Sequence, residues 1–179
     1  MLNVDHTALV LIDVQGRLAR AMHDSEPLIS RIRCLIQGLQ ALEVPVVWVE
    51  QYPEGLGPTI PEVADLLTGQ SPISKLSFGC GESREVMAEI ERLGRRQLLL
   101  CGIESHVCVY QSAAQFLNRE YEVQVVADAV SARTTHNHQL GLNRMASLGA
   151  HITSVEMVLF ELMGRCDHPQ FKTLLKLVK

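Results

Sequence analysis

Short apolar, β-branched runs alternate with longer amphipathic stretches along the whole chain, and this alternation constrains the fold most. It is typical of βαβ units. The expected strands are residues 7–14, 44–50, 71–75, 97–101, 122–127 and 151–154. The expected helices are residues 26–42, 83–93, 106–119 and 136–148, with a helical tail from residue 156. Strands separated by helices lie parallel with right-handed crossovers, so the pattern predicts an α/β fold. Runs as apolar as Leu98-Leu99-Leu100 suit strands covered on both faces.

Length and charge indicate the number of domains and exclude some classes of partner. At about 150 residues per domain, the 179 residues predict one domain spanning 1–179. The net charge is −4 and no basic run exceeds the Arg95-Arg96 pair, so we expect neither nucleic acid nor a membrane surface as a partner. The longest apolar runs are far shorter than the ~20 residues that span a bilayer.

The cysteines bear on both location and chemistry. The N-terminus lacks a basic start followed by an apolar stretch, so we expect a cytoplasmic protein with reduced thiols. The five cysteines include no C-x-x-C pair, which argues against a disulfide framework and a cysteine-rich zinc site. A free thiol is therefore available as a nucleophile.

Polar residues follow several expected strands, and ligands of open α/β sheets bind outside the carboxyl ends of the strands. These residues are Asp13 with Gln15, Glu50 with Gln51, Lys75, Cys108 and Asp128. An acid, a lysine and a thiol are thus expected at one edge of the sheet. The Pro- and Gly-rich segment 51–70 is interpreted as a wall of the same site, because long loops in compact domains are usually functional.

Cys108 is the strongest candidate nucleophile. A thiol in the first turn of a helix is expected to have a lowered pKa, and a nearby Lys75 would lower this pKa further. Asp13 is then placed to take the thiol proton and deliver it to a leaving group. The alternative is that Cys108 is only a core residue, an interpretation that suits Cys34 and Cys101 better. Asp13 and Lys75 also have an alternative, as an ordinary ion pair with each other.

Three segments carry a resemblance to a known family. They are Leu11-Ile12-Asp13-Val14-Gln15, Lys75 followed by Phe78, and Gly102-Ile103-Glu104-Ser105-His106-Val107-Cys108-Val109. They resemble the signature segments of the isochorismatase-like cysteine hydrolases, and the similarity runs from about residue 7 to residue 153. Residues 50–57 resemble the branch that contains the YcaC-related bacterial hydrolases and the isochorismatase-domain proteins of animals.

The resemblance implies a three-layer, doubly wound, Rossmann-like fold with a six-stranded parallel sheet and helices on both faces. It implies a catalytic triad of Asp13, Lys75 and Cys108. It also implies a cis peptide bond between Ile103 and Glu104, with the backbone N–H groups of Glu104 and Cys108 forming an oxyanion hole. Members of the family commonly assemble into homo-oligomers, so a dimer or a larger assembly is expected.

Two departures from related families narrow the function. Nicotinamidases hold a metal through an Asp-x-His pair and a further His, whereas this region reads Glu50-Gln51-Tyr52 with no histidine between His23 and His106. We therefore expect no metal and no cofactor. Isochorismatases proper commonly lack the cysteine, so Cys108 favours hydrolysis of a small amide, carbamoyl or related C–N substrate through a thioester.

Several assignments stay open at this stage. Gln15, Gln51 and Phe78 are candidate substrate-binding residues, and the identity of the substrate cannot be read from the sequence. Cys80 and His106 lie near the triad in sequence without an assigned role. The alternatives to a hydrolase are a non-catalytic protein that retains the fold, and a thiol-redox protein that pairs Cys108 with Cys80 or Cys101.

Overall fold

A six-stranded parallel sheet forms the centre of the computed structural model, which describes residues 1–179. The strands lie in the order β3-β2-β1-β4-β5-β6 and every neighbouring pair is parallel. The strands are β1 (Thr7–Ile12), β2 (Val46–Gln51), β3 (Ile73–Lys75), β4 (Gln97–Ile103), β5 (Glu122–Ser131) and β6 (His151–Thr153). The predicted α/β class with a six-stranded parallel sheet is confirmed.

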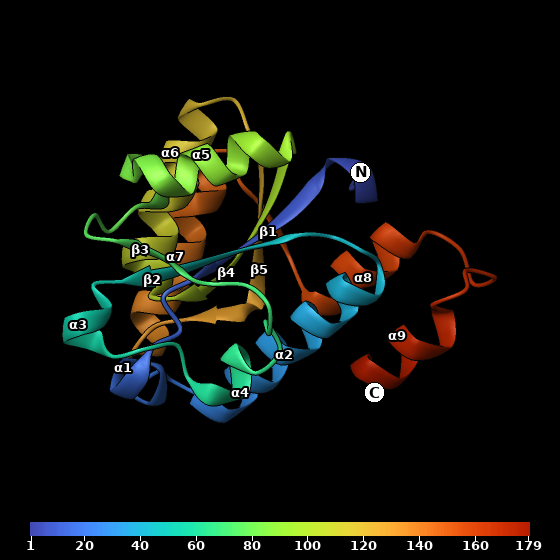
Figure 1. The fold of residues 1–179 in the computed structure, drawn as a ribbon, viewed down its shortest axis with the longest axis horizontal. Coiled ribbons are helices and arrows are strands. Elements are labelled where there is room, and N and C mark those ends of the chain that lie inside the picture. The colour runs from blue at the N-terminus through green and yellow to red at the C-terminus, as the bar shows by residue number, and fades with distance from the viewer.

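Helices cover both faces of the sheet (Figure 1). One face is covered by α5 (Arg84–Leu93), α6 (Tyr110–Asn118) and α7 (Thr135–Ser147). The other is covered by α2 (Ser25–Ala41), α8 (Val155–Met163) and α9 (Phe171–Val178). Strand β1 is buried along its whole length and serves both layers, since Leu9 and Leu11 pack with α2 and Val10 packs on the opposite side. This double burial explains why β1 is apolar throughout.

The remaining helical segments are short. They are the 3₁₀ turns η1 (Val4–His6) and η2 (Cys80–Glu82), the single-turn helices α1 (Gly16–Arg20), α3 (Pro53–Leu56) and α4 (Pro61–Ala64), and the wide π-type turn η3 (Ser105–Val109). Of these, α1, α3 and α4 surround the carboxyl ends of β1 and β2, within or beside the segment interpreted as a wall. No helix has both the length and the apolar character needed to cross a membrane.

The strand order reverses direction at β1 and β4. The chain adds β2 and β3 on one side of β1, and then crosses back to add β4, β5 and β6 on the other side. In open α/β sheets a ligand crevice forms at this kind of switch point, outside the carboxyl ends of the two strands. Asp13 directly follows β1 and Glu104 directly follows β4, so both lie at the switch point.

Gly102 permits the close approach of β4 to β1 at this point. Its φ is +113°, which L side chains rarely adopt, and a Cβ there would lie 2.0 Å from the carbonyl oxygen of Ile12. Only glycine therefore fits beside the end of β1 without moving the backbone that carries Asp13.

The observed helices differ from the expected ones in several places. Helices α1, α3 and α4 were not predicted, because four or five residues are too few to show a helical period. The predicted helix 106–119 begins instead with the wide turn η3, so that regular α-helix starts only at Tyr110. The helical tail is divided into α8 and α9 because Gly164, in the left-handed conformation, ends α8.

Candidate active site

Asp13 lies at the carboxyl end of β1 in a left-handed backbone conformation, with φ of +55°. Aspartate tolerates this conformation better than most residues, and here it follows a strand that is entirely buried. Its side chain is only 2% exposed, and Oδ2 accepts a hydrogen bond of 2.8 Å from Nζ of Lys75. The carboxylate is thus paired rather than solvated, as a buried charge must be.

Lys75 ends the edge strand β3, so its side chain passes β2 to reach the end of β1. The side chain is 0% exposed. Besides Asp13, its ammonium donates to Oε1 of Gln51 at 2.8 Å and to the carbonyl oxygens of Ser77 at 3.1 Å and Phe78 at 2.9 Å. Four acceptors surround three protons, so no donor of this ammonium is left for another group.

Cys108 lies in the turn η3 and its thiol faces the Asp13 carboxylate. Burial raises the pKa of Asp13 above its ordinary value, although Lys75 and the nearby Cys108 thiol act to lower it. Oδ1 of Asp13 has no hydrogen-bond partner within the protein. The structure therefore brings the three predicted triad residues together.

The thiol differs from the sequence-based expectation in its ionisation. Burial, together with the adjacent Asp13 carboxylate, raises the pKa of Cys108 well above its usual range, although Lys75 acts to lower it. The expected lowering at a helix start is absent because Cys108 sits in a buried turn that precedes α6. A pKa raised in this way keeps the thiol protonated at neutral pH.

The backbone at the end of β4, just before η3, has two unusual features. The Ile103–Glu104 peptide bond is cis, as the resemblance implies. The Glu104 N–H donates to no acceptor within the protein, although it lies at the end of a buried strand. The Glu104 carboxylate points elsewhere, because Oε2 accepts from both N and Nε of Arg133 at 3.1 Å.

A cavity of about 200 Å³ opens above these groups. It is lined by Asp13, Leu18, Gln51, Leu56, Phe78, Ile103, Glu104, Val107 and Cys108. The segment interpreted as a wall contributes Gln51 and Leu56, and the residues after β3 contribute Phe78. Leu18, Leu56 and Val107 were not singled out from the sequence, because isolated apolar residues in short segments show no pattern.

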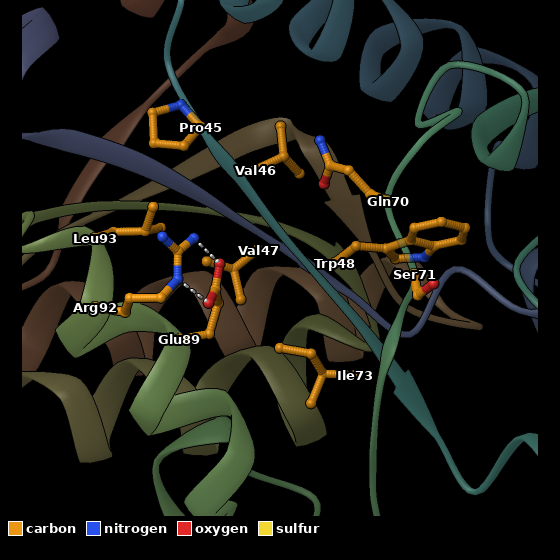
Figure 2. A pocket seen from close by; sticks show the side chains of 10 residues that line it. All are labelled: Pro45, Val46, Val47, Trp48, Gln70, Ser71, Ile73, Glu89, Arg92 and Leu93. Carbon is orange, nitrogen blue, oxygen red and sulfur yellow. Dashed lines mark hydrogen bonds and ion pairs between the residues drawn. The ribbon is translucent and has the colours of Figure 1, made fainter.

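A larger hollow of about 410 Å³ lies at the opposite end of the sheet. Figure 2 shows it around the start of β2, where Val47 lies beside the ion pair between Glu89 and Arg92 of α5. It contains no thiol, and none of the triad residues lines it. The smaller cavity is therefore the candidate active site.

The three candidate substrate-binding residues have different surroundings. Phe78 lines the cavity and is more than half exposed. Gln51 also lines it, but its amide is engaged by Lys75 and by the carbonyl oxygen of Leu76. Gln15 lies behind the wall, where its amide accepts from the N–H of Gln51 and donates to the carbonyl oxygens of Gln51 and Gly57. Gln15 positions the wall and does not line the cavity.

Glu50 is a second buried group that holds the wall. Its Oε1 accepts hydrogen bonds from N and Oγ1 of Thr59, at 2.6 and 2.7 Å, and Trp48 Nε1 donates to the same hydroxyl. The sequence signal for Glu50 was its position as a carboxylate at the end of an apolar strand. Asp128, in contrast, lies within β5 and accepts from the N–H of Val155, away from the cavity.

The neighbouring cysteine and histidine complete the surroundings. Cys80 is fully buried, and burial raises the pKa of its thiol to about 12. Its N–H donates to Oγ of Ser112, which in turn donates to the carbonyl oxygen of Cys108. His106 does not line the cavity, and its Nδ1 is buried without a partner. No group of three or more His, Cys, Asp or Glu side chains is arranged to hold a metal ion.

Fold and site together define a doubly wound α/β protein with an Asp–Lys–Cys constellation at its switch point. The isochorismatase domain model matches residues 7–157. The chain belongs to the isochorismatase family and has the hydrolase fold of that family.

Known relatives agree with this assignment. Isochorismatase domain-containing protein 1 of Salmo salar is 37% identical over 176 residues, which cover 97% of this chain. The chain spans about three fifths of that relative, since the match covers 61% of its length. The structure of MAR1 ribonuclease from Caenorhabditis elegans is 33% identical, with a TM-score of 0.92 over 99% of this chain and 91% of that one.

A bacterial structure shares the fold at lower identity. The YcaC gene product of Escherichia coli, described as an octameric hydrolase of unknown specificity, is 21% identical. Its TM-score is 0.92 over 98% of this chain and 89% of that chain. The expected family, including its YcaC-like structural relatives, is thus confirmed.

The buried ion pair predicts a distinctive pattern of stability. Lys75→Met leaves the Asp13 charge without its partner, so we expect the free energy of unfolding to fall by about 3–5 kcal/mol. Asp13→Asn combined with Lys75→Met removes both charges and is expected to be more stable than the single Lys75→Met variant. Urea unfolding of the wild type and these two variants measures this, and a double variant no more stable than Lys75→Met contradicts it.

Proposed function

We propose that this chain is a metal-independent cysteine hydrolase that acts on a small amide, carbamoyl or related C–N substrate through a thioester on Cys108. The observation that carries this proposal is the Asp13 carboxylate, held by Lys75 and facing the Cys108 thiol at one cavity. A protonated thiol beside a carboxylate is an activated nucleophile with its own general base.

The proposed reaction has two stages. In the first, Asp13 takes the thiol proton while Sγ bonds to the substrate carbonyl carbon. The carbonyl oxygen becomes an oxyanion, which the N–H groups of Glu104 and Cys108 stabilise, and the free N–H of Glu104 supports this role. Asp13 then gives its proton to the nitrogen, the C–N bond breaks, and an amine or ammonia leaves.

In the second stage a water molecule replaces the leaving group. Asp13 takes a proton from the water, whose oxygen bonds to the thioester carbon. The S–C bond breaks, the carboxylic acid leaves, and Asp13 returns the proton to sulfur. Lys75 keeps the carboxylate in place and stabilises negative charge on Asp13 and on the sulfur of Cys108.

We propose no ribonuclease activity for this chain, although its Caenorhabditis elegans relative is named MAR1 ribonuclease. The net charge is −4, and no Arg, Lys or His side chain lines the cavity. Binding of a nucleic acid backbone relies on such cations. We therefore propose a small-molecule substrate, and we propose no nucleic acid partner. The five free cysteines favour a reducing compartment, so we also propose a cytoplasmic location.

The thioester can be trapped directly. Incubation with a panel of small primary amides, followed by acid quenching and peptide mass spectrometry, is expected to show an acyl group on Cys108. Cys108→Ala should abolish that adduct and reduce ammonia release by more than about a thousandfold. The matched control is Cys166→Ala, which removes an exposed thiol and should leave both unchanged. Undiminished turnover in Cys108→Ala contradicts the proposal.

The pH dependence reports on Asp13. The pKa of Asp13 is raised by burial, so kcat/KM is expected to fall with decreasing pH at values above the ordinary aspartate pKa of about 4. The negative charge of Glu50 also raises the pKa of Asp13, so Glu50→Gln should move this acid limb to lower pH. Measurement of kcat/KM from pH 4 to 8 for both proteins tests these effects. A shift of the acid limb to higher pH in Glu50→Gln contradicts the prediction.

We further propose that the chain forms a homo-oligomer through a rim patch of four exposed apolar side chains. They are Tyr52, Leu56, Leu76 and Phe78. Leu56 and Phe78 also line the cavity, and the Tyr52 N–H donates to the carbonyl oxygen of Lys75, so the patch borders the active site. Apolar surface gathered in this way is typical of an interface. The octameric state described for the Escherichia coli relative supports the same proposal.

Substitution at the most exposed member tests the rim patch. Leu76 is 78% exposed, so Leu76→Asp should fold normally and raise the dissociation constant of the oligomer by at least about tenfold. Met157→Asp changes an exposed apolar residue on α8 and should leave assembly unaltered. Sedimentation velocity measures both variants. Wild-type protein that sediments as a 20 kDa monomer at micromolar concentration argues against the patch as an interface.

A further inference from the structure

We propose that this cavity selects a small, uncharged amide with a short hydrocarbon acyl group and rejects molecules that carry a carboxylate. The inference rests on the proposed function and deepens it by naming the class of substrate. It follows from three properties of the cavity: its charge, its apolar lining and its size.

The charges around the cavity are already paired. Lys75 is the cation of the triad, and its ammonium has four acceptors and no exposed surface. Arg133 is paired with Glu104, and it does not line the cavity. A substrate carboxylate would therefore lose its hydration without gaining a positive partner.

The negative charge of Asp13 beside the reacting sulfur also disfavours an anionic substrate. The Asp13 carboxylate faces the Cys108 thiol, and both are part of the cavity lining. An anion that approaches sulfur also approaches this carboxylate, at a depth where water screens charge poorly. A neutral carbonyl compound meets no such repulsion.

The lining specifies the rest of the molecule. Leu18, Leu56, Phe78, Ile103 and Val107 form the greater part of the cavity surface, and they contact a ligand through carbon. The amide of Gln51 is engaged by Lys75 and Leu76, so it does not offer an unpaired polar group either. Hydrocarbon is the chemistry that matches such a surface.

The volume limits the length of the acyl group. About 200 Å³ is below the range of drug-sized pockets and corresponds to the space of roughly seven water molecules. A volume of this size favours an amide with a short acyl group over a drug-sized molecule. A dicarboxylate such as isochorismate carries two charges for which the lining offers no cation.

A matched pair of alkylating reagents tests the charge selection without requiring turnover. Iodoacetamide and iodoacetate each transfer a two-carbon unit to a thiolate with loss of iodide, and they differ in charge. Rates at pH 7.5 are measured by peptide mass spectrometry at Cys108 and at the exposed Cys166. The preference for iodoacetamide at Cys108 should exceed that at Cys166 by at least about tenfold. Equal preferences at the two cysteines overturn the proposal.

A cation added at the cavity wall should reverse the selection. Leu18→Arg places a guanidinium in the lining outside the rim patch, so the iodoacetate rate at Cys108 should rise severalfold. Leu148→Arg is the matched control, because it adds the same charge at an exposed position outside the cavity. An equal rise in both variants overturns the proposal.

Hydrolysis of two amides of equal size separates this inference from the proposed function. In 3-methylbutanamide an isopropyl group occupies the place of the carboxylate in malonamate. We expect ammonia release from the former to be at least about a hundredfold faster. Equal rates overturn the charge selection and leave the proposed function standing. Selective alkylation with hydrolysis of neither amide, and with no acyl adduct from the amide panel, upholds the charge selection and overturns the proposed function.

Discussion

The ion pair between Asp13 and Lys75 is the interaction on which the rest of the site depends, because neither charge is stable at this depth alone. The lysine begins on the edge strand β3 and ends at β1, so the pair ties together the ends of three neighbouring strands. The ammonium also requires the carbonyl oxygens of Ser77 and Phe78. The chain after β3 must therefore curl around it, and this curl brings Phe78 to the cavity.

The same burial determines how the triad can work. A solvated thiol near a lysine would ionise more readily, whereas burial and the facing carboxylate raise the pKa of Cys108. Proton transfer to Asp13 must then accompany formation of the S–C bond in the proposed reaction. The base directly follows β1 and the nucleophile lies in the turn η3 after β4, so the ends of these two neighbouring strands set the distance between them.

Much of this arrangement was predictable from the sequence, since apolar strands and helical periods leave strong patterns and parallel strands place their carboxyl ends at one edge. Asp13, Lys75 and Cys108 were expected at that edge, and the structure places them in contact. The role of Gln15 was not predictable, because a buried amide that holds backbone groups looks the same in sequence as one that binds a ligand. The raised pKa of Cys108 was also missed, since burial of a single turn depends on tertiary packing.

The hydrogen bonds of Gln15 and Glu50 have a consequence for how this family can diversify. They hold the wall at Gln51, Gly57 and Thr59, through groups that lie behind the cavity surface. Residues 53–56 therefore lie between two segments that are held by hydrogen bonds, and Leu56 lines the cavity. Side chains within residues 53–56 can be substituted during evolution without a change in the position of the triad. New substrate preferences are thus accessible by single mutations that leave the chemistry intact.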